Sequence, residues 1–125
     1  MPRWLFKEEP SHFSYADLER DGSTKWEGVK NPLAAKYLRQ VKADDRIFLY
    51  HTGKEKAVVG EMRAKSAADG VVTVVPVRRL KRPVTLAEIK AEKSLADWEL
   101  VRISRLSVMP VSDAIWKKIV AMAAG

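Results

Sequence analysis

The chain has 125 residues, of which 46% are hydrophobic and 31% charged, with only six glycines and six prolines. This length fits one domain over residues 1–125, and the composition excludes wholesale disorder and collagen-like or low-complexity sequence. Cysteine is absent, which excludes disulfides, thiolate zinc sites and thiol nucleophiles. The net charge of +7 favours a polyanionic partner, usually nucleic acid.

No apolar run approaches the roughly 20 residues that a membrane helix needs. The opening residues turn acidic at Glu8 and Glu9, too early for the apolar stretch of a signal peptide. We therefore expect a cytoplasmic monomer without membrane contact.

Hydrophobic periodicity and turn residues predict an alternation of short helices and strands. In chain order we expect a buried strand over 3–7, helices over 15–21 and 32–41, strands over 46–50, 57–64 and 71–80, a helix over 86–92, strands over 99–103 and 107–111, and a final helix after 112. This order indicates an α+β domain around a small, mostly antiparallel and barrel-like sheet.

Capping and turn residues support these boundaries. Side chains that cap helix N-termini precede each predicted helix, and Gly22 ends the first one. Asp69-Gly70 predicts a hairpin turn, and Pro76 predicts an edge position or a bulge in the strand that follows. The capping residues are Ser14, Asn31, Thr85 and Ser112.

Few residues are of the types that carry catalysis. Two histidines, His12 and His51, are too few for a metal cluster, and no Gly-rich phosphate loop or nucleophile elbow is present. A Ser-His-Asp site assembled in space stays open. Composition therefore favours a binding module over an enzyme, with no cofactor and no metal.

The four tryptophans are the most informative side chains. Trp98 lies beside a predicted strand and Trp116 in the predicted final helix, and both are expected in the core. Trp26 is expected in a polar surface loop between two helices, where it either covers a core edge or offers a flat face to a ligand. An indole face flanked by polar groups suits capture of a single base that has left its stack.

Seven short motifs in order resemble the EVE domain family, which is thymocyte nuclear protein-like and PUA-like. The matching segments span nearly the whole chain and are residues 4–10, 15–22, 26–31, 48–52, 58–60, 82–86 and 104–111. The resemblance implies a PUA-like fold, in which a curved, barrel-like sheet is flanked by short helices. It also implies kinship with YTH domains, which read methylated adenine in RNA, and with ASCH domains; EVE domains are associated with modified cytosine in DNA.

Carried over residue by residue, the resemblance implies a base pocket with Trp26 as its wall. Polar lining and a pocket mouth would come from Lys7, Asn31, Tyr50, His51, Thr52, Arg105 and Ser107. Family members commonly have Ser at the position of Glu8, and a carboxylate there, if it faces the pocket, would accept hydrogen bonds from an exocyclic amine. They also often carry a longer insertion, where this chain has only the short hairpin over 66–70.

Alternative readings stay open beside this one. Tyr50 and His51 could be structural, Arg105 could pair with an acid, and Lys7 could simply reach solvent. Basic side chains offer phosphate contacts by charge alone: Lys25, Lys30, Arg78, Arg79, Lys81 and Arg82.

Three functions follow from these patterns. The first is a non-catalytic reader that holds one base, modified cytosine or methylated adenine, from DNA or RNA. The second is an ASCH-like hydrolase of a modified nucleoside, in which Lys7 with Glu8 or Glu9 supplies a nucleophile or base. The third is an RNA-binding accessory domain that uses the basic cluster over 78–82.

Overall fold

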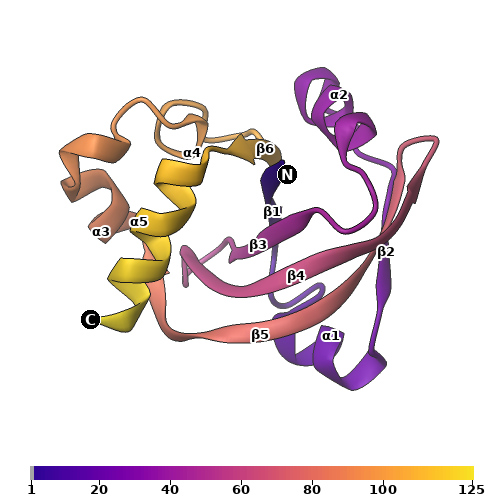
Figure 1. The fold of residues 1–125 in the computed structure, drawn as a ribbon, viewed down its shortest axis with the longest axis horizontal. Helices are drawn as coiled ribbons and strands as arrows, with labels where there is room; N and C mark the ends of the chain where they lie inside the picture. Colours follow the sequence, from indigo (N-terminus) through magenta and orange to yellow (C-terminus); the bar gives the residue numbers. More distant parts are fainter. Residues whose placement is uncertain (1) are drawn as a thin grey trace.

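The computed structural model describes residues 2–125 and forms one six-stranded, curled sheet with helices around it (Figure 1). The strand order across the sheet is β2-β5-β4-β3-β1-β6. The strands are β1 (Arg3–Glu8), β2 (Thr24–Trp26), β3 (Arg46–His51), β4 (Ala57–Ala68), β5 (Val71–Thr85) and β6 (Val108–Val111). The helices are α1 (Tyr15–Asp21), α2 (Pro32–Gln40), α3 (Leu86–Ala91), η1 (Lys93–Leu95), α4 (Glu99–Arg102) and α5 (Asp113–Ala124).

Among the described residues 2–125, one strand pair in the sheet is parallel. Strand β1 runs parallel to β3, whereas β6–β1, β3–β4, β4–β5 and β5–β2 are antiparallel. A parallel pair requires a crossover connection, and here the crossover contains α1, β2 and α2. Within this crossover, β2 pairs with Val72–Val74 of β5, at the opposite edge of the sheet from β6. The expected PUA-like architecture is confirmed.

Helix caps occur where the sequence predicts them. Ser14 and Asp17 form a capping box at the start of α1, and Thr85 and Glu88 form a second one at α3. Gly22 ends α1 in the left-handed region with φ of 80°. Each cap satisfies backbone N–H groups that have no partner inside the helix.

The long β4–β5 hairpin also follows its sequence signals. Asp69 and Gly70 both have positive φ, as a tight hairpin turn of the primed type requires. Pro76 lies opposite Met62, next to a register shift in the β4–β5 ladder. The predicted bulge at this proline is therefore confirmed.

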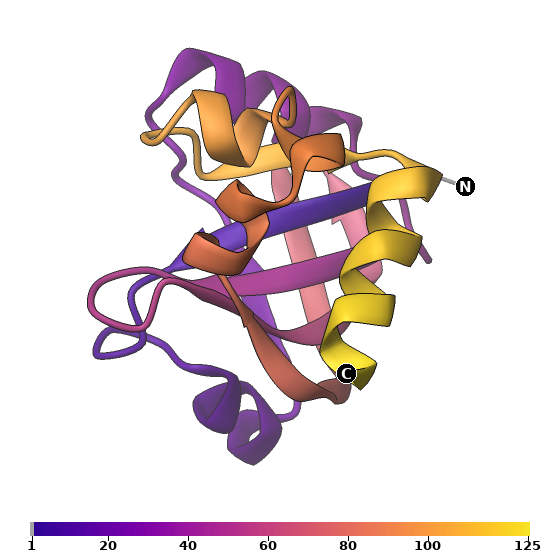
Figure 2. The ribbon, with the colours of Figure 1, turned by 90° about the vertical axis from the view of Figure 1, so that its left-hand side faces the viewer.

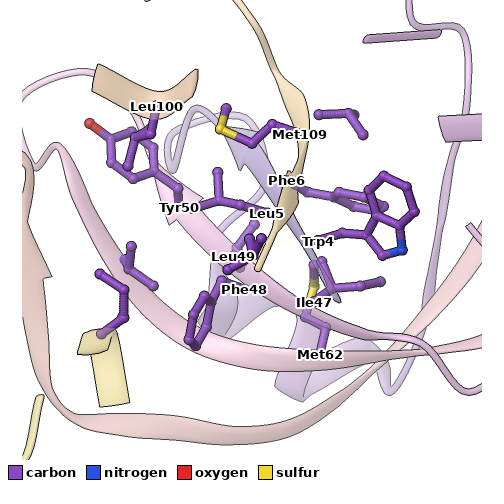
Figure 3. Close-up of a cluster of buried hydrophobic side chains, with 14 of the residues drawn as sticks. Trp4, Leu5, Phe6, Ile47, Phe48, Leu49, Tyr50, Met62, Leu100 and Met109 are labelled. Atoms are coloured by element: carbon purple, nitrogen blue, oxygen red, sulfur yellow. The ribbon is translucent and has the colours of Figure 1, made fainter. Parts of the chain in front are cut away.

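Buried side chains lie on both faces of the sheet, and α5 runs along one of them (Figure 2). Trp116 of α5 stacks on Phe48 of β3 with ring centroids 3.7 Å apart, and Trp98 is 2% exposed. The expectation that these two tryptophans pack in the core is confirmed. Figure 3 shows that Trp4 and Phe6 point to one side of the buried cluster, whereas Phe48 and Tyr50 point to the other.

Two predicted elements are wrong. Residues 99–103 do not form a strand: the Trp98 carbonyl accepts from Val101 and Arg102 N–H, which closes the single turn of α4. The edge of β1 is already paired with β6, so it is not open to a strand over 99–103. One helical turn buries Leu100 as well as a strand would, and alternation over five residues therefore could not distinguish a helix from a strand. Trp26 lies in strand β2 rather than in a loop, because Thr24–Trp26 pairs with β5.

Candidate functional site

A pocket of about 260 Å³ opens between the end of β1, the turn that follows it, and β2. It is lined by Glu8, His12, Phe13, Thr24, Lys25, Trp26 and Glu27. Two aromatic rings and several polar side chains therefore converge on one hollow. Three of the residues predicted from the sequence meet here: Glu8, Lys25 and Trp26.

Trp26 forms one wall of this pocket. Its indole packs on Phe6 of β1, with ring centroids 5.2 Å apart and an angle of 44° between the rings. The residue is 9% exposed, so most of the ring is held by the core and the remainder borders the pocket. A wall fixed in this way offers a rigid aromatic surface beside open space.

Glu8 enters the pocket because of strand alternation. Successive side chains of a strand point to opposite faces, so Glu8 lies on the same face of β1 as Trp4 and Phe6. The Glu8 carboxylate pairs with Nδ1 of His12, and the Glu8 side chain is 22% exposed against 81% for His12. The hydrogen bond and the negative charge of Glu8 raise the pKa of His12, which favours the charged imidazolium form.

Sequence reasoning missed four lining residues: His12, Phe13, Thr24 and Glu27. His12 and Phe13 lie in the turn after β1, where their N–H groups both donate to the Glu9 carbonyl at 2.9 and 3.0 Å. A turn has no hydrophobic period, and only its position directly after a strand that carries Glu8 could have pointed to these side chains.

Lys7 lies on the opposite face of β1 from Glu8. Its Nζ donates to the Ser104 carbonyl at 2.9 Å and lies 5.5 Å from the centroid of the Tyr50 ring. Burial lowers the pKa of Lys7 and raises the pKa of Tyr50. Tyr50 is 3% exposed and lies near Leu100, away from Trp4 and Phe6 (Figure 3). The structure thus does not bring Lys7 and Tyr50 to the pocket that Trp26 lines.

His51 holds α1 in place. Its Nε2 accepts from the Tyr15 N–H at 3.1 Å, and its Nδ1 pairs with Glu55 Oε1 at 2.8 Å. These partners place the proton of a neutral ring on Nδ1. The His51 side chain is buried and already engaged on both nitrogens, outside the pocket lining.

Asn31 and Thr52 also make local structural contacts. The Asn31 side-chain oxygen accepts from the Ala34 N–H at 3.0 Å and caps α2. Thr52 donates from its N–H to the Glu8 carbonyl at 2.9 Å and from its hydroxyl to Glu9 at 3.3 Å. Thr52 therefore fixes the backbone of Glu8 rather than lining the pocket itself.

The remaining predicted contacts are dispersed. Lys30 is exposed in the connection between β2 and α2, and Arg105 is exposed before β6. The Ser107 carbonyl accepts from the Lys7 N–H at 2.9 Å, which places Ser107 with Lys7 rather than with Trp26.

The basic cluster over residues 78–82 lies on β5 and is largely paired with acids. Arg78 approaches the buried Glu61 at 3.5 Å, Arg79 pairs with Glu19 at 2.7 Å, and Arg82 pairs with Glu88 at 2.9 Å. A second hollow, of about 300 Å³, is lined here by β5 and α5 and includes Lys81. These cations thus lie apart from the pocket of Trp26.

Within residues 2–125, no group of three or more His, Asp or Glu side chains is placed to hold a metal ion. No helix in this part of the chain is long and apolar enough to cross a membrane.

Comparison with solved structures finds close structural relatives. A protein of Rhodopseudomonas palustris solved by NMR superposes with a TM-score of 0.93 at 35% identity, covering 99% of this chain and 94% of that one. Human THYN1 protein, crystallised with DNA that contains 5-methylcytosine, superposes with a TM-score of 0.92 at 25% identity, covering 100% and 99%. An ASCH protein of Zymomonas mobilis shares the fold alone, with a TM-score of 0.60 at 14% identity.

Sequence comparison agrees with the structural relatives. Thymocyte nuclear protein 1 of Rattus norvegicus is 29% identical over 154 residues, covering 88% of this chain and 68% of the relative. That alignment is longer than this 125-residue chain, so the relative carries inserted residues. The family model of the EVE domain matches residues 2–122, and the chain therefore belongs to the EVE domain family.

Proposed function

We propose that this protein is a nucleic-acid-binding module that holds one modified base against Trp26. The pocket between β1 and β2 carries this proposal, because it joins an aromatic wall to polar side chains in one open hollow. Stacking on an aromatic face contributes ~1–3 kcal/mol per base, and polar groups at the edge then select the base. Residues 1–125 act in this proposal as a single module and as a monomer.

The human relative supports the choice of ligand. Human THYN1 protein was crystallised with DNA that contains 5-methylcytosine, and its fold matches this chain over nearly its full length. We therefore propose modified cytosine in DNA as the first ligand to test. Methylated adenine and RNA are the alternatives that the same pocket admits.

Charge supports a nucleic-acid partner. Lys25 lines the pocket and Lys30 lies five residues further along the same segment, both exposed. Each lysine that neutralises a phosphate makes the affinity fall as the salt concentration rises. In a plot of log affinity against log salt concentration, each contact adds about 0.7–0.9 to the downward slope. We assign these two lysines to the backbone on either side of the captured base.

Fluorescence anisotropy with labelled oligonucleotides tests the proposal. Single-stranded probes carry one 5-methylcytosine, one N6-methyladenine or no modification, as DNA and as RNA, at two salt concentrations. We expect the modified cytosine probe to bind tightest, and Trp26→Ala to weaken its binding about tenfold or more, because the stacking face is lost. Trp26→Phe keeps a ring and should retain most of the affinity.

The matched control is Trp98→Phe, which changes a buried indole that does not line the pocket. It should leave the affinity unchanged, and thermal unfolding of each variant shows that the fold is intact. Absence of binding to every probe, or equal binding by wild type and folded Trp26→Ala, would contradict the proposal.

The other two functions place different demands on the residues. A hydrolase that pairs Lys7 with Glu8 needs both at one site, yet they lie on opposite faces of β1. The alternative partner, Glu9, does not line the pocket, and its carboxylate accepts from the hydroxyls of Ser11 and Thr52. Shape reading by the basic cluster needs free cations, yet Arg78, Arg79 and Arg82 already pair with carboxylates. Neutralising Lys25 and Lys30 should thus weaken binding more than neutralising Arg79 and Lys81.

A further inference from the structure

We propose that Glu8 makes the pocket selective for bases that carry an exocyclic amine, that is, cytosine- or adenine-type bases rather than thymine or uracil. This inference rests on the proposed function, because it assigns a chemical class to the base that Trp26 holds. It concerns a side chain of this chain that lies in the pocket beside the aromatic wall.

The backbone fixes where the Glu8 carboxylate lies. Glu8 pairs in register with His51, and its carbonyl accepts from the Thr52 N–H at 2.9 Å, so the end of β1 is anchored on β3. Two residues earlier on the same face, Phe6 supports the Trp26 ring. The Glu8 side chain therefore leaves the backbone next to the surface on which a base would stack, and its carboxylate pairs there with His12.

One carboxylate oxygen is available to a ligand. Oε1 of Glu8 contacts Nδ1 of His12, whereas no hydrogen bond to Oε2 is found among residues 2–125. An ionised carboxylate only accepts hydrogen bonds, so Oε2 of Glu8 can accept one from a donor group of a ligand. The exposed His12 can remain on Oε1 and neutralise the charge, which limits repulsion of the phosphates of the same strand.

The exocyclic amines of cytosine and adenine meet this demand. Cytosine N4–H₂ and adenine N6–H₂ are donors, and Glu accepting from cytosine N4 is an established pairing. Thymine and uracil carry the acceptor O4 at the equivalent position. Their N3–H is flanked by two carbonyls, so a carboxylate that faces it also faces an oxygen without a proton, which is costly where water is excluded.

Two further charged side chains border the pocket, Lys25 and Glu27, and both are exposed. Exposed side chains are solvated and mobile and specify a base edge less well than a carboxylate that is partly buried and paired with a neighbour. Glu8, at 22% exposure, is the one lining carboxylate held this closely within the described chain.

The test compares 5-methylcytosine with thymine in single-stranded DNA probes of otherwise identical sequence. Both bases carry the same 5-methyl group, and single strands remove any difference in pairing with a second strand. We expect wild type to prefer 5-methylcytosine by about tenfold or more. Glu8→Gln should reduce this ratio to near one, because its amide can donate to O4 as well as accept.

Glu9→Gln is the matched control, since Glu9 is the neighbouring carboxylate and does not line the pocket. It should keep the wild-type ratio. Glu8→Asp keeps the carboxylate and should still prefer 5-methylcytosine.

The outcomes separate this inference from the proposed function. Equal binding of both probes by wild type, lost in Trp26→Ala, overturns the selectivity and leaves base capture standing. Binding of neither probe overturns base capture itself. An unchanged ratio of 5-methylcytosine to thymine affinity in folded Glu8→Gln also overturns the inference. If that variant does not fold, a wild-type ratio near one overturns the inference and a ratio of about ten or more supports it.

Discussion

Gly60 of β4 has no Cβ, and this leaves room for the ring of Tyr15, the first residue of α1. A Cβ built at Gly60 would lie 2.4 Å from the Tyr15 ring, which is too close for any packed atom. Tyr15 is 1% exposed and donates from its hydroxyl to the Glu61 carbonyl at 2.8 Å. Burial raises the pKa of Tyr15 to about 12.

Gly60→Ala should therefore lower the free energy of unfolding by about 1–3 kcal/mol through overpacking. Urea denaturation measures this loss. The matched background is Tyr15→Ala, in which the same substitution has room and should cost much less. An equal cost in both backgrounds would show that the ring is not the cause.

The role of a residue can be predicted from the sequence where its immediate neighbours along the chain determine whether it is buried and which face it occupies. Trp98 and Trp116 are expected in the core because large aromatic side chains beside or within apolar elements pack inward, and both are buried. The separation of Lys7 from Glu8 was also available from the sequence, because adjacent residues of a strand cannot line one pocket. His12 and Phe13 were not predictable, because only the folded turn brings them beside Trp26.

Asn31 acts at the scale of the element, where it caps α2. Asn31→Ala should lower the free energy of unfolding by about 1 kcal/mol, because the Ala34 N–H loses its acceptor. Asn31→Ser keeps a side-chain oxygen for the cap and should retain most of the stability. Thermal and urea unfolding of the two variants check this, and equal losses in both would contradict the capping role.

Elements with their own end signals were predicted well. The capping boxes at α1 and α3 and the Asp69-Gly70 turn are local, so each is readable from a few residues. Residues 99–103 were predicted wrongly because one locally hydrogen-bonded turn buries Leu100 as well as a strand would. Residues 24–26 were predicted wrongly because their strand depends on a partner far along the chain. β2 exists only because β5 offers an edge to pair with, and three residues are too few to show alternation.

Arg82 connects three elements of the whole molecule. From β5 it pairs with Glu88 of α3 and donates to the Met122 carbonyl of α5 at 2.7 Å. The hydrogen bond from Arg82 and those from Thr85 lower the pKa of Glu88 from 4.5 to about 2. A carboxyl group whose pKa is lower in the folded than in the unfolded state stabilises the fold at any pH above its unfolded pKa. This contribution is lost as the pH falls toward the folded pKa of about 2.

The melting temperature of wild type should therefore exceed that of Glu88→Gln near neutral pH. The difference should shrink between the unfolded pKa of 4.5 and the folded value of about 2. Differential scanning calorimetry across this range measures it. In an Arg82→Gln background the pH dependence should be smaller, whereas the same pH profile in both backgrounds would remove Arg82 as the main cause.

The parallel pairing of β1 with β3 has a consequence for folding kinetics. β1 and β3 can join only after the intervening crossover closes a long loop, which is slow compared with forming the β4–β5 hairpin. Glu8, His12 and Trp26 flank or lie within that crossover, so the hollow between them cannot exist in a chain that has formed only its hairpins. Ligand capture during refolding should then lag behind strand formation, and a ligand present at that stage would trap only fully assembled molecules.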